Sequence, residues 1–121
     1  MALPNVSQPF GIATEWSGDT VVLRVTGELI AQHETEVNEA VEQALTTGAK
    51  HLLVDLRDVG FIDSLGVRSL IRSQLRSRAG DYSFGVVPGR GQVFRVVKTM
   101  GLDRVLRVLD ESAAGLPASS R

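Results

Sequence analysis

Cysteine is absent from the 121 residues, and aromatic side chains make up only 5% of them. A chain without cysteine forms no disulfides and offers no thiolate ligands to a metal, which fits a cytoplasmic protein. The two histidines, His33 and His51, do not have the spacing of a paired metal site, so we expect no metal and no cofactor. The scarcity of aromatic residues predicts a core of Val, Leu and Ile side chains.

An excess of positive charge is also lacking, because 13 basic residues are balanced by 14 acidic ones. No overall field therefore draws the chain to nucleic acid or to an anionic membrane surface. No apolar run is long enough to cross a bilayer, and the start "MALPNVSQPFG" lacks the basic and apolar regions of a secretory signal. We expect one soluble domain that binds neither nucleic acid nor a membrane directly.

Hydrophobic periodicity alternates along the chain between the period of strands and the period of helices. Two β-type runs at 10–16 and 20–29 are joined by a short link that contains Gly18, which predicts an antiparallel hairpin. The later runs predict, in order, a helix at 32–46, a strand at 51–56, a helix at 64–78, a strand at 82–87, a helix at 91–101 and a strand at 104–109.

The stretch 91–101 is rich in β-branched residues and suits a strand as well, but its position between two strands and Gly101 as a stop favour a helix. In the helix at 64–78, an apolar stripe is expected to face the core, and it consists of Val67, Leu70, Ile71 and Leu75.

Repeated strand–helix–strand units require parallel strand pairing with right-handed crossovers. The predicted fold class is therefore α/β: a small, mostly parallel mixed sheet with an antiparallel N-terminal edge hairpin and helices packed on it. We expect a flexible leader at 1–9, the domain itself at 10–110 and a flexible tail at 111–121, because the two end segments show no apolar face to dock.

The stretch "GFIDSLGVRSL", residues 60–70, places an acid, a hydroxyl and a glycine where a strand leads into a helix. Helix capping alone accounts for Asp63 and Ser64, because their oxygens accept hydrogen bonds from free first-turn amides. Two features point to more than capping. The turn lies at the carboxyl edge of the sheet, where open α/β sheets usually place their sites, and Gly66 is a poor helix residue that lets another backbone or a ligand approach.

This segment resembles the phosphorylation motif of the STAS domain in bacterial anti-sigma factor antagonists. In that family an apolar strand ends in Asp-Ser-x-Gly and a helix follows, and here Asp63-Ser64-Leu65-Gly66 stands at the motif. Upstream "VVLRVTGEL" is similar to the family's strand ending in Gly-Glu-Leu, and downstream "VFRVVKTMGLDRVLRV" is similar to its third helix, Gly-Leu turn and last strand. The resemblance covers about residues 10–110 and implies a STAS-like fold.

The resemblance implies a binding and switching module rather than an enzyme. In the family the unphosphorylated antagonist binds an anti-sigma factor that is a serine kinase and releases sigma factor, phosphorylation of the motif serine blocks binding, and a serine phosphatase resets the switch. Carried over, Ser64 is the phosphoacceptor. The expected partner-binding residues surround it in the chain or precede the first helix: Asp63, Leu65, Gly66, Val67, Arg68, Ile30 and His33.

One departure from the family and two alternatives bear on this interpretation. The family often has Asp after Gly-Glu-Leu, whereas this chain has Ile30. A STAS subunit of a transporter or of a larger signalling assembly is the first alternative, with the serine unmodified. The second is a small nucleotide-binding or hydrolytic protein that uses Ser64, with His33 as a base, or the turn in "PGRGQ", although no nucleophile-elbow motif is present.

A basic stripe follows the motif, because Arg68, Arg72 and Arg76 recur at four-residue spacing. We expect it to be a solvated helix face that contributes to docking on an acidic partner. Nucleic-acid binding is not indicated, since no aromatic residues are interleaved with these arginines.

Overall fold

Four strands form one mixed sheet whose spatial order follows the order of the chain, β1-β2-β3-β4. The computed structural model describes residues 8–118, so most of the predicted leader and the end of the predicted tail lie outside the described residues. The elements are β1 (Gly11–Ser17), β2 (Thr20–Leu29), α1 (Glu34–Thr46), β3 (His51–Ile62), α2 (Ser64–Ala79), β4 (Ser83–Val87) and α3 (Gln92–Thr99), with short 3-10 helices at Ala31–His33 and Leu102–Arg104.

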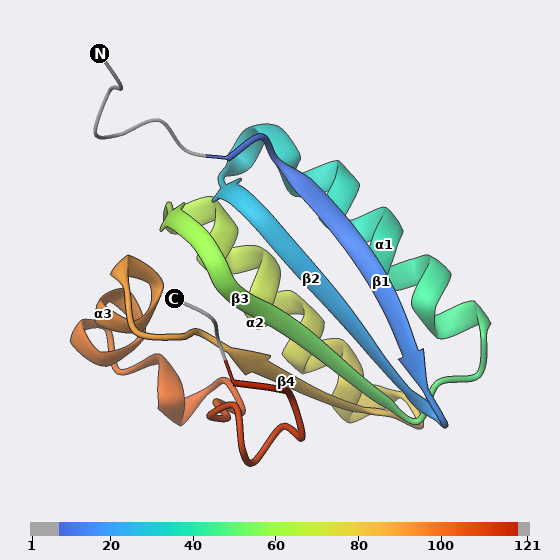
Figure 1. Cartoon of the computed structure of the whole chain (residues 1–121). Helices are drawn as coiled ribbons and strands as arrows, with labels where there is room; N and C mark the ends of the chain where they lie inside the picture. Colours follow the sequence, from blue (N-terminus) through green and yellow to red (C-terminus); the bar gives the residue numbers. More distant parts are fainter. Residues whose placement is uncertain (1–7, 119–121) are drawn as a thin grey trace.

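The pairing of the strands confirms the predicted fold class. β1 runs antiparallel to β2, whereas β2–β3 and β3–β4 are parallel pairs. Figure 1 shows α1 and α2 side by side behind the sheet, with α3 beside the carboxyl end of β3. The parallel order places the carboxyl ends of β2 and β3 at the same edge of the sheet, where the turn to α2 begins.

The core lies between the sheet and its helices, and Val93 and Val97 of α3 belong to it together with residues of α1 and α2. Alternate residues of β2, such as Val21, Leu23 and Val25, face the helices and are buried, as expected for a strand with a two-residue period. Phe84 is the one aromatic side chain among the buried core residues of the described chain, so the predicted aliphatic core is confirmed. Only Asp63 separates the end of β3 from the start of α2, and this direct connection places Ser64 at the edge of the core.

β3 is twice as long as the sequence predicts. The predicted strand ended at residue 56, because polar residues interrupt the apolar run after it, but the strand continues to Ile62. Backbone pairing with β2 sustains it: Gly27 pairs with Val59 after one shift of register, and Leu29 pairs with Ile62 after a second. The extension carries the chain directly to Asp63, with no loop between the strand and the capping residue of α2.

The predicted strand at 104–109 is wrong. Val108 forms only one isolated bridge, with Val86 of β4, and the chain before it turns as a 3-10 helix. Gly101 adopts a left-handed backbone (φ 63°) that ends the preceding helix, as predicted, and the amide of Leu106 donates to the carbonyl of Leu102 at 2.7 Å. This turn uses the residues that a strand would have needed for a ladder. The ambiguous stretch before it is the helix α3, as favoured from the sequence.

The inward face of α2 also differs from the predicted stripe. Leu75 is 54% exposed, whereas the serines at 69, 73 and 77 are buried. Their small side chains face the rest of the fold at helical spacing, and Ser69 points its hydroxyl 3.5 Å from a carboxylate oxygen of Glu34 on α1. A search for apolar spacing misses such a face, because close packing between helices favours small residues as well as apolar ones.

The face of the sheet away from the helices carries a buried ion pair. Asp55 is only 3% exposed, and its two carboxylate oxygens each accept a hydrogen bond from the guanidinium of Arg57 at 2.9 Å. This hydrogen bond raises the pKa of Arg57 above its ordinary value. The same guanidinium donates to the carbonyl of Pro117 at 2.6 Å and lies 3.5 Å from Glu111. Arg57 therefore fastens the described part of the C-terminal segment to this face, while the flexibility of the segment stays a prediction.

Candidate functional site

Ser64 is the first residue of α2 and is exposed, and its hydroxyl makes no hydrogen bond with residues 8–118. The capping role belongs to its neighbour: the Oδ1 atom of Asp63 accepts a hydrogen bond from the amide of Gly66 at 2.8 Å. Capping therefore accounts for the acid of the motif and leaves the serine hydroxyl without a structural task. An exposed hydroxyl at a helix start is accessible to another protein.

Asp63 also connects the motif to the loop after β2. Its Oδ2 atom accepts from the amide of Ala31 at 3.3 Å, and its own amide donates to the carbonyl of Leu29 at 3.3 Å. These contacts bring half-buried Ile30, which stands where the family often has Asp, to the same edge of the sheet as Ser64. The sequence predicted these two segments at one edge; the bonds between them depend on the tertiary structure.

Gly66 is present because a backbone lies against it. A Cβ atom at this position would be 2.2 Å from the carbonyl oxygen of Leu29 and 2.9 Å from Cγ1 of Ile62. Of the two reasons considered for this glycine, close approach of another backbone is the one that the structure shows. The glycine allows the first turn of α2 to pack directly against the end of β2. This contact fixes the position of Ser64 relative to the sheet.

Gln92 is a residue of this site that sequence reasoning missed. Its side-chain Oε1 accepts from the amide of Ile62 at 2.9 Å, and its Nε2 donates to the carbonyl of the same residue at 3.4 Å. β4 pairs with β3 only as far as Asp55, so the amide side chain replaces a missing strand at the end of β3. No local pattern indicates this role, because residues 62 and 92 are brought together only by the fold.

Phe61 is a second residue of this site that the sequence analysis did not identify, although strand alternation indicates its outward direction. Its side chain is 43% exposed, three residues before Ser64, while the next residue, Ile62, is buried. Strand alternation predicts this outward direction once the strand is known to extend so far. We call Ile30, Phe61, Asp63, Ser64 and Leu65 the Ser64 patch. It combines apolar side chains with one carboxylate and one free hydroxyl.

The other residues expected to contact a partner differ in accessibility. Val67 is 5% exposed and belongs to the core. It therefore packs beneath the surface of the Ser64 patch and is not accessible to a partner. Arg68 is exposed and forms an ion pair with Glu34 of α1 at 3.7 Å. His33 is half-buried: its ring is stacked on Phe10 at a centroid distance of 3.8 Å, and its Nδ1 lies 3.1 Å from Glu36.

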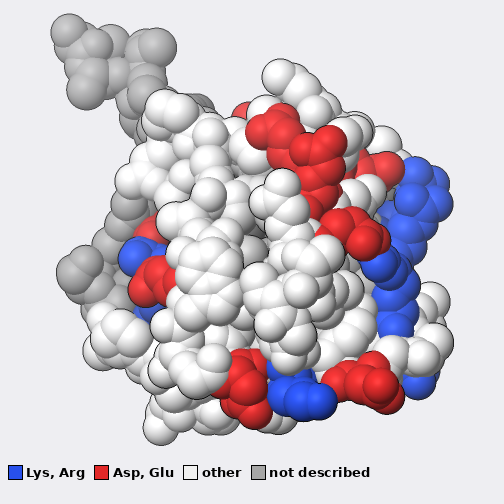
Figure 2. Space-filling view, turned by 90° about the vertical axis from the view of Figure 1, so that its right-hand side faces the viewer, with Lys and Arg blue, Asp and Glu red and all other residues white. Residues whose placement is uncertain are grey.

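The basic stripe on α2 is matched by acids on α1. Arg72 lies 3.8 Å from Glu34, and Arg76 is paired with Glu42. Figure 2 shows basic side chains in a column along one margin with acidic side chains beside it. The stripe remains about half exposed, but its charge is largely balanced within the protein. The stripe therefore connects α2 to α1 through surface ion pairs, each of modest energy.

The same residues do not form the contacts of a hydrolytic or metal site within the described chain. Within residues 8–118, no hydrogen bond joins His33 to Ser64, so the base that a hydrolytic serine requires is not in place. Across that range, no three His, Asp or Glu side chains gather closely enough to hold a metal ion. No helix of the described chain has the length and apolar character of a membrane span.

A short mixed sheet with helices on one face and a serine motif at the end of a central strand defines a domain of the STAS type. The family described as "Mlab, STAS domain" matches residues 12–109. Because the match spans most of the sequence, the chain belongs to the STAS domain family.

Solved structures with the same fold include regulators and a transporter-family protein. An anti-sigma factor antagonist from Mycobacterium paratuberculosis is 22% identical, with a TM-score of 0.75 over 95% of this chain and 97% of that one. SpoIIAA, an anti-sigma factor antagonist in its unphosphorylated form, is 22% identical, with a TM-score of 0.68 over 86% and 92%. A sulfate transporter family protein from Wolinella succinogenes is 14% identical, with a TM-score of 0.68 over 82% and 85%. At these identities the likeness shows the shared fold.

Proposed function

We propose that this protein is an anti-sigma factor antagonist in which Ser64 is the phosphoacceptor of a serine kinase. In this proposal the unphosphorylated protein binds the kinase, which is itself the anti-sigma factor, through the Ser64 patch. Phosphorylation of Ser64 ends the complex, and a serine phosphatase restores the unphosphorylated state. Membership of the STAS family and the fold shared with SpoIIAA, which has been solved in unphosphorylated and, from Bacillus, phosphorylated forms, support this role.

The observation that carries the proposal is the free, exposed hydroxyl of Ser64 beside a carboxylate that is fully engaged. Asp63 caps the helix and holds the loop after β2, so the fold does not need the serine oxygen. A kinase can reach this oxygen, and a change there leaves the capping contacts in place. The domain can therefore accept a modification at the residue that its partner contacts.

The charge of a phosphate acts differently on the fold and on the complex. A phosphoserine carries about −1.5 to −2 charges at neutral pH. At the first residue of α2 this charge lies near free first-turn amides and the positive end of the helix dipole, which favour it. Within the Ser64 patch it lies next to Asp63 and Leu65 in the chain, and docking of a partner would strip it of water. The fold tolerates the phosphate and the complex does not.

A second candidate is a STAS subunit of a transporter or signalling assembly in which Ser64 is an unmodified contact. The apolar character of Ile30 supports it, because an apolar residue at this edge enlarges a contact patch that needs no charge switch. A sulfate transporter family protein from Wolinella succinogenes has the same fold, which is compatible with this candidate. The two candidates differ in one measurable property, the modification of Ser64.

Intact-mass measurement after incubation with ATP and purified candidate anti-sigma kinases separates them. We expect the mass of one phosphate to be added to the wild type and to Ser17→Ala, which removes another exposed serine, and no addition to Ser64→Ala. If no such kinase binds or modifies the wild type, the transporter-type contact is favoured. Addition that persists in Ser64→Ala would contradict the proposal.

A charge at position 64 is expected to weaken the complex by at least about tenfold while leaving the melting temperature within about 2 °C of wild type. The change is Ser64→Asp, and Ser64→Asn is the control with nearly the same size and no charge. Titration calorimetry with the unphosphorylated partner gives the affinities, and calorimetric melting gives the stability. Equal affinities for the two variants would show that charge at this position does not control docking.

A further inference from the structure

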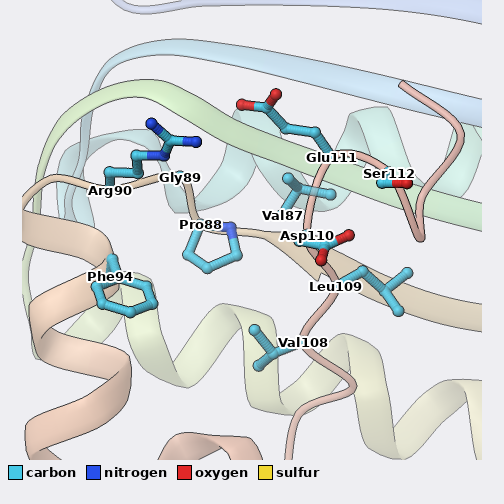
Figure 3. Close-up of a pocket in the computed structure, with 10 residues that line it drawn as sticks. All are labelled: Val87, Pro88, Gly89, Arg90, Phe94, Val108, Leu109, Asp110, Glu111 and Ser112. Atoms are coloured by element: carbon cyan, nitrogen blue, oxygen red, sulfur yellow. The ribbon is translucent and has the colours of Figure 1, made fainter. Parts of the chain in front are cut away.

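A pocket of about 340 Å³ lies on the side of the sheet away from α1 and α2, next to the end of β4. Its walls come from three segments that are distant in sequence: the loop that follows β4, the first turn of α3, and residues 108–112 of the C-terminal segment. Figure 3 shows Phe94 and Pro88 facing Val108 and Leu109 across this space, with Arg90 and Glu111 on one side of it. The volume is at the lower end of the range for ligand sites and suits one ring or a short apolar chain.

Hydrogen bonds to β4 and close packing on β3 hold the walls in place. The amide of Val86 donates to the carbonyl of Arg107 at 2.9 Å, and the amide of Leu109 donates to the carbonyl of Val86 at 2.9 Å. On the other side, Gly89 has a left-handed backbone (φ 76°), and a Cβ there would lie 3.1 Å from Cα of Arg57, so the loop rests directly on β3. The pocket is thus formed by fixed main-chain segments and exists before any ligand enters.

The charged groups around the pocket are not equivalent. Glu111 lies 3.5 Å from the guanidinium of Arg57, and Oδ1 of Asp110 accepts from the amide of Ala113 at 2.6 Å. Both acids therefore have cationic or amide partners within the protein. Arg90 is exposed and forms no ion pair or hydrogen bond with residues 8–118. It is the lining residue with five donors and nothing among the described residues to receive them.

We propose that this pocket binds a small amphipathic carboxylate, with its apolar body against Phe94 and its carboxylate on Arg90. Burying an aromatic or branched aliphatic group there removes apolar surface from water on both partners. A planar guanidinium matches a carboxylate in two parallel hydrogen bonds, which are stronger than neutral ones. The carboxylate has two natural sources, a free small acid and the C-terminus of a protein that ends in an apolar residue. The proposal does not depend on a role for Ser64.

Chemical-shift titration of the ¹⁵N-labelled chain with 3-phenylpropionate tests the site, with 3-phenylpropionamide as the uncharged probe of the same shape. We expect the acid to shift the amides of Gly89, Gly91 and Leu109 and to bind about tenfold more tightly than the amide, as a charge-assisted hydrogen bond predicts. Equal binding of acid and amide, or shifts confined to another part of the molecule, would overturn the proposal.

Two arginine variants separate a specific contact from a general effect of charge. Arg90→Gln is expected to remove the preference for the acid over the amide. Arg78→Gln has the same change in net charge at an exposed arginine of α2 that also lacks an ion pair with the described residues, and it should keep the preference. Equal losses in both variants would overturn the assignment to Arg90. Phe94→Ala should weaken acid and amide alike, because it removes the apolar wall.

A comparison with a short peptide identifies the natural source of the carboxylate. N-acetyl-Gly-Gly-Phe with a free C-terminus is compared with its C-terminal amide and with 3-phenylpropionate. Tighter binding of the free peptide than of the small acid identifies a protein C-terminus as the natural ligand, and weaker binding identifies a free acid. Both results support the site, whereas a peptide acid that binds no better than its amide would count against it.

Discussion

The two halves of β3 are held in different ways. Residues 51–55 pair with β2 on one side and β4 on the other in a regular register, and the central ones are buried. Residues 56–62 pair with β2 alone, through two shifts of register, and the side-chain amide of Gln92 replaces the missing strand at the end. Two backbone ladders and apolar volume therefore hold the first half, whereas the second half depends on one ladder, to β2, and on the side chain of Gln92. Ser64 follows the second half, so its position depends on these fewer contacts.

The largest effect on stability is expected in the first half. Leu52→Ala removes a fully buried side chain and should lower the free energy of unfolding by about 3–5 kcal/mol, because a cavity adds to the lost burial. Leu75→Ala, at a largely exposed leucine of α2, is the matched control and should change it by less than about 0.5 kcal/mol. Urea titration measures both. Similar losses for the two variants would show that the core does not lie where this structure has it.

A smaller loss of stability, with a clear effect on the site, is expected at the start of α2. Gly66→Ala improves helix propensity, yet its methyl group would overlap the carbonyl of Leu29, so we expect a net loss of about 2–3 kcal/mol and a displaced Ser64. Gly60→Ala adds the same group in β3, six residues earlier, where nothing lies within 4 Å, and it should be neutral. Melting curves and the rate of Ser64 phosphorylation report the two effects. A stabilised Gly66→Ala protein would contradict the close approach.

Replacing the side chain that stands in for a strand should cost less again. Gln92→Leu leaves the amide and the carbonyl of Ile62 without this partner, and we expect a loss of about 1–2 kcal/mol. Hydrogen exchange should increase most at Ile62 and Asp63 and least at Leu53. Gln92→Glu keeps the acceptor for the amide of Ile62 and should retain part of its protection. Uniform changes in exchange along β3 would argue that Gln92 has no special role at its end.

The smallest effect concerns a hydroxyl at the opposite end of the sheet. The hydroxyl of Tyr82 is buried and makes no hydrogen bond with the described residues, and its burial raises the pKa of this phenol above 10.0. The folded protein then holds the proton more tightly than the unfolded chain, so this contribution to stability is complete below about pH 10 and is lost as the pH rises further. Tyr82→Phe should match wild type at pH 7 and lose less stability above pH 10.

Absorbance of tyrosinate gives an independent measurement, because the chain contains a single tyrosine. Its midpoint in the folded protein should lie above that of the urea-unfolded chain. Coincident midpoints, or the same alkaline loss of stability in Tyr82→Phe and wild type, would mean that burial does not disfavour the ionised form. Tyr82 and Ser64 both lack a hydrogen-bond partner among the described residues, but only the hydroxyl of Ser64 is open to solvent.

Sequence patterns predicted most of the fold, and the errors have physical causes. The order of strands and helices up to α3 and the mixed sheet follow from hydrophobic period and chain connectivity, both of which are local properties. The strand predicted at 104–109 failed because "RVLRVL" has strand-forming residues but only one position where β4 can pair with it. The early end predicted for β3 failed for the converse reason, since pairing with β2 extends a strand through polar residues.

The candidate site shows the same division. The Asp63-Ser64-Leu65-Gly66 segment, its place at the start of a helix and its edge of the sheet were all predicted from neighbouring residues. Gln92 was not, because its role rests on two hydrogen bonds across 30 positions of sequence. The arginines of α2 were predicted to face solvent, and their ion pairs with α1 could not be read from spacing within one helix.

By itself the sequence determined which segments become strands and helices, that the core is aliphatic, and that a hydroxyl follows a capping acid where the third strand ends. These follow from preferences that each residue expresses toward its near neighbours. Only the tertiary structure decided that Gly66 rests on Leu29, that Gln92 completes β3, and that Arg57 ties the C-terminal segment to the open face of the sheet. Those contacts join distant segments, and their energies exist only after the chain has folded.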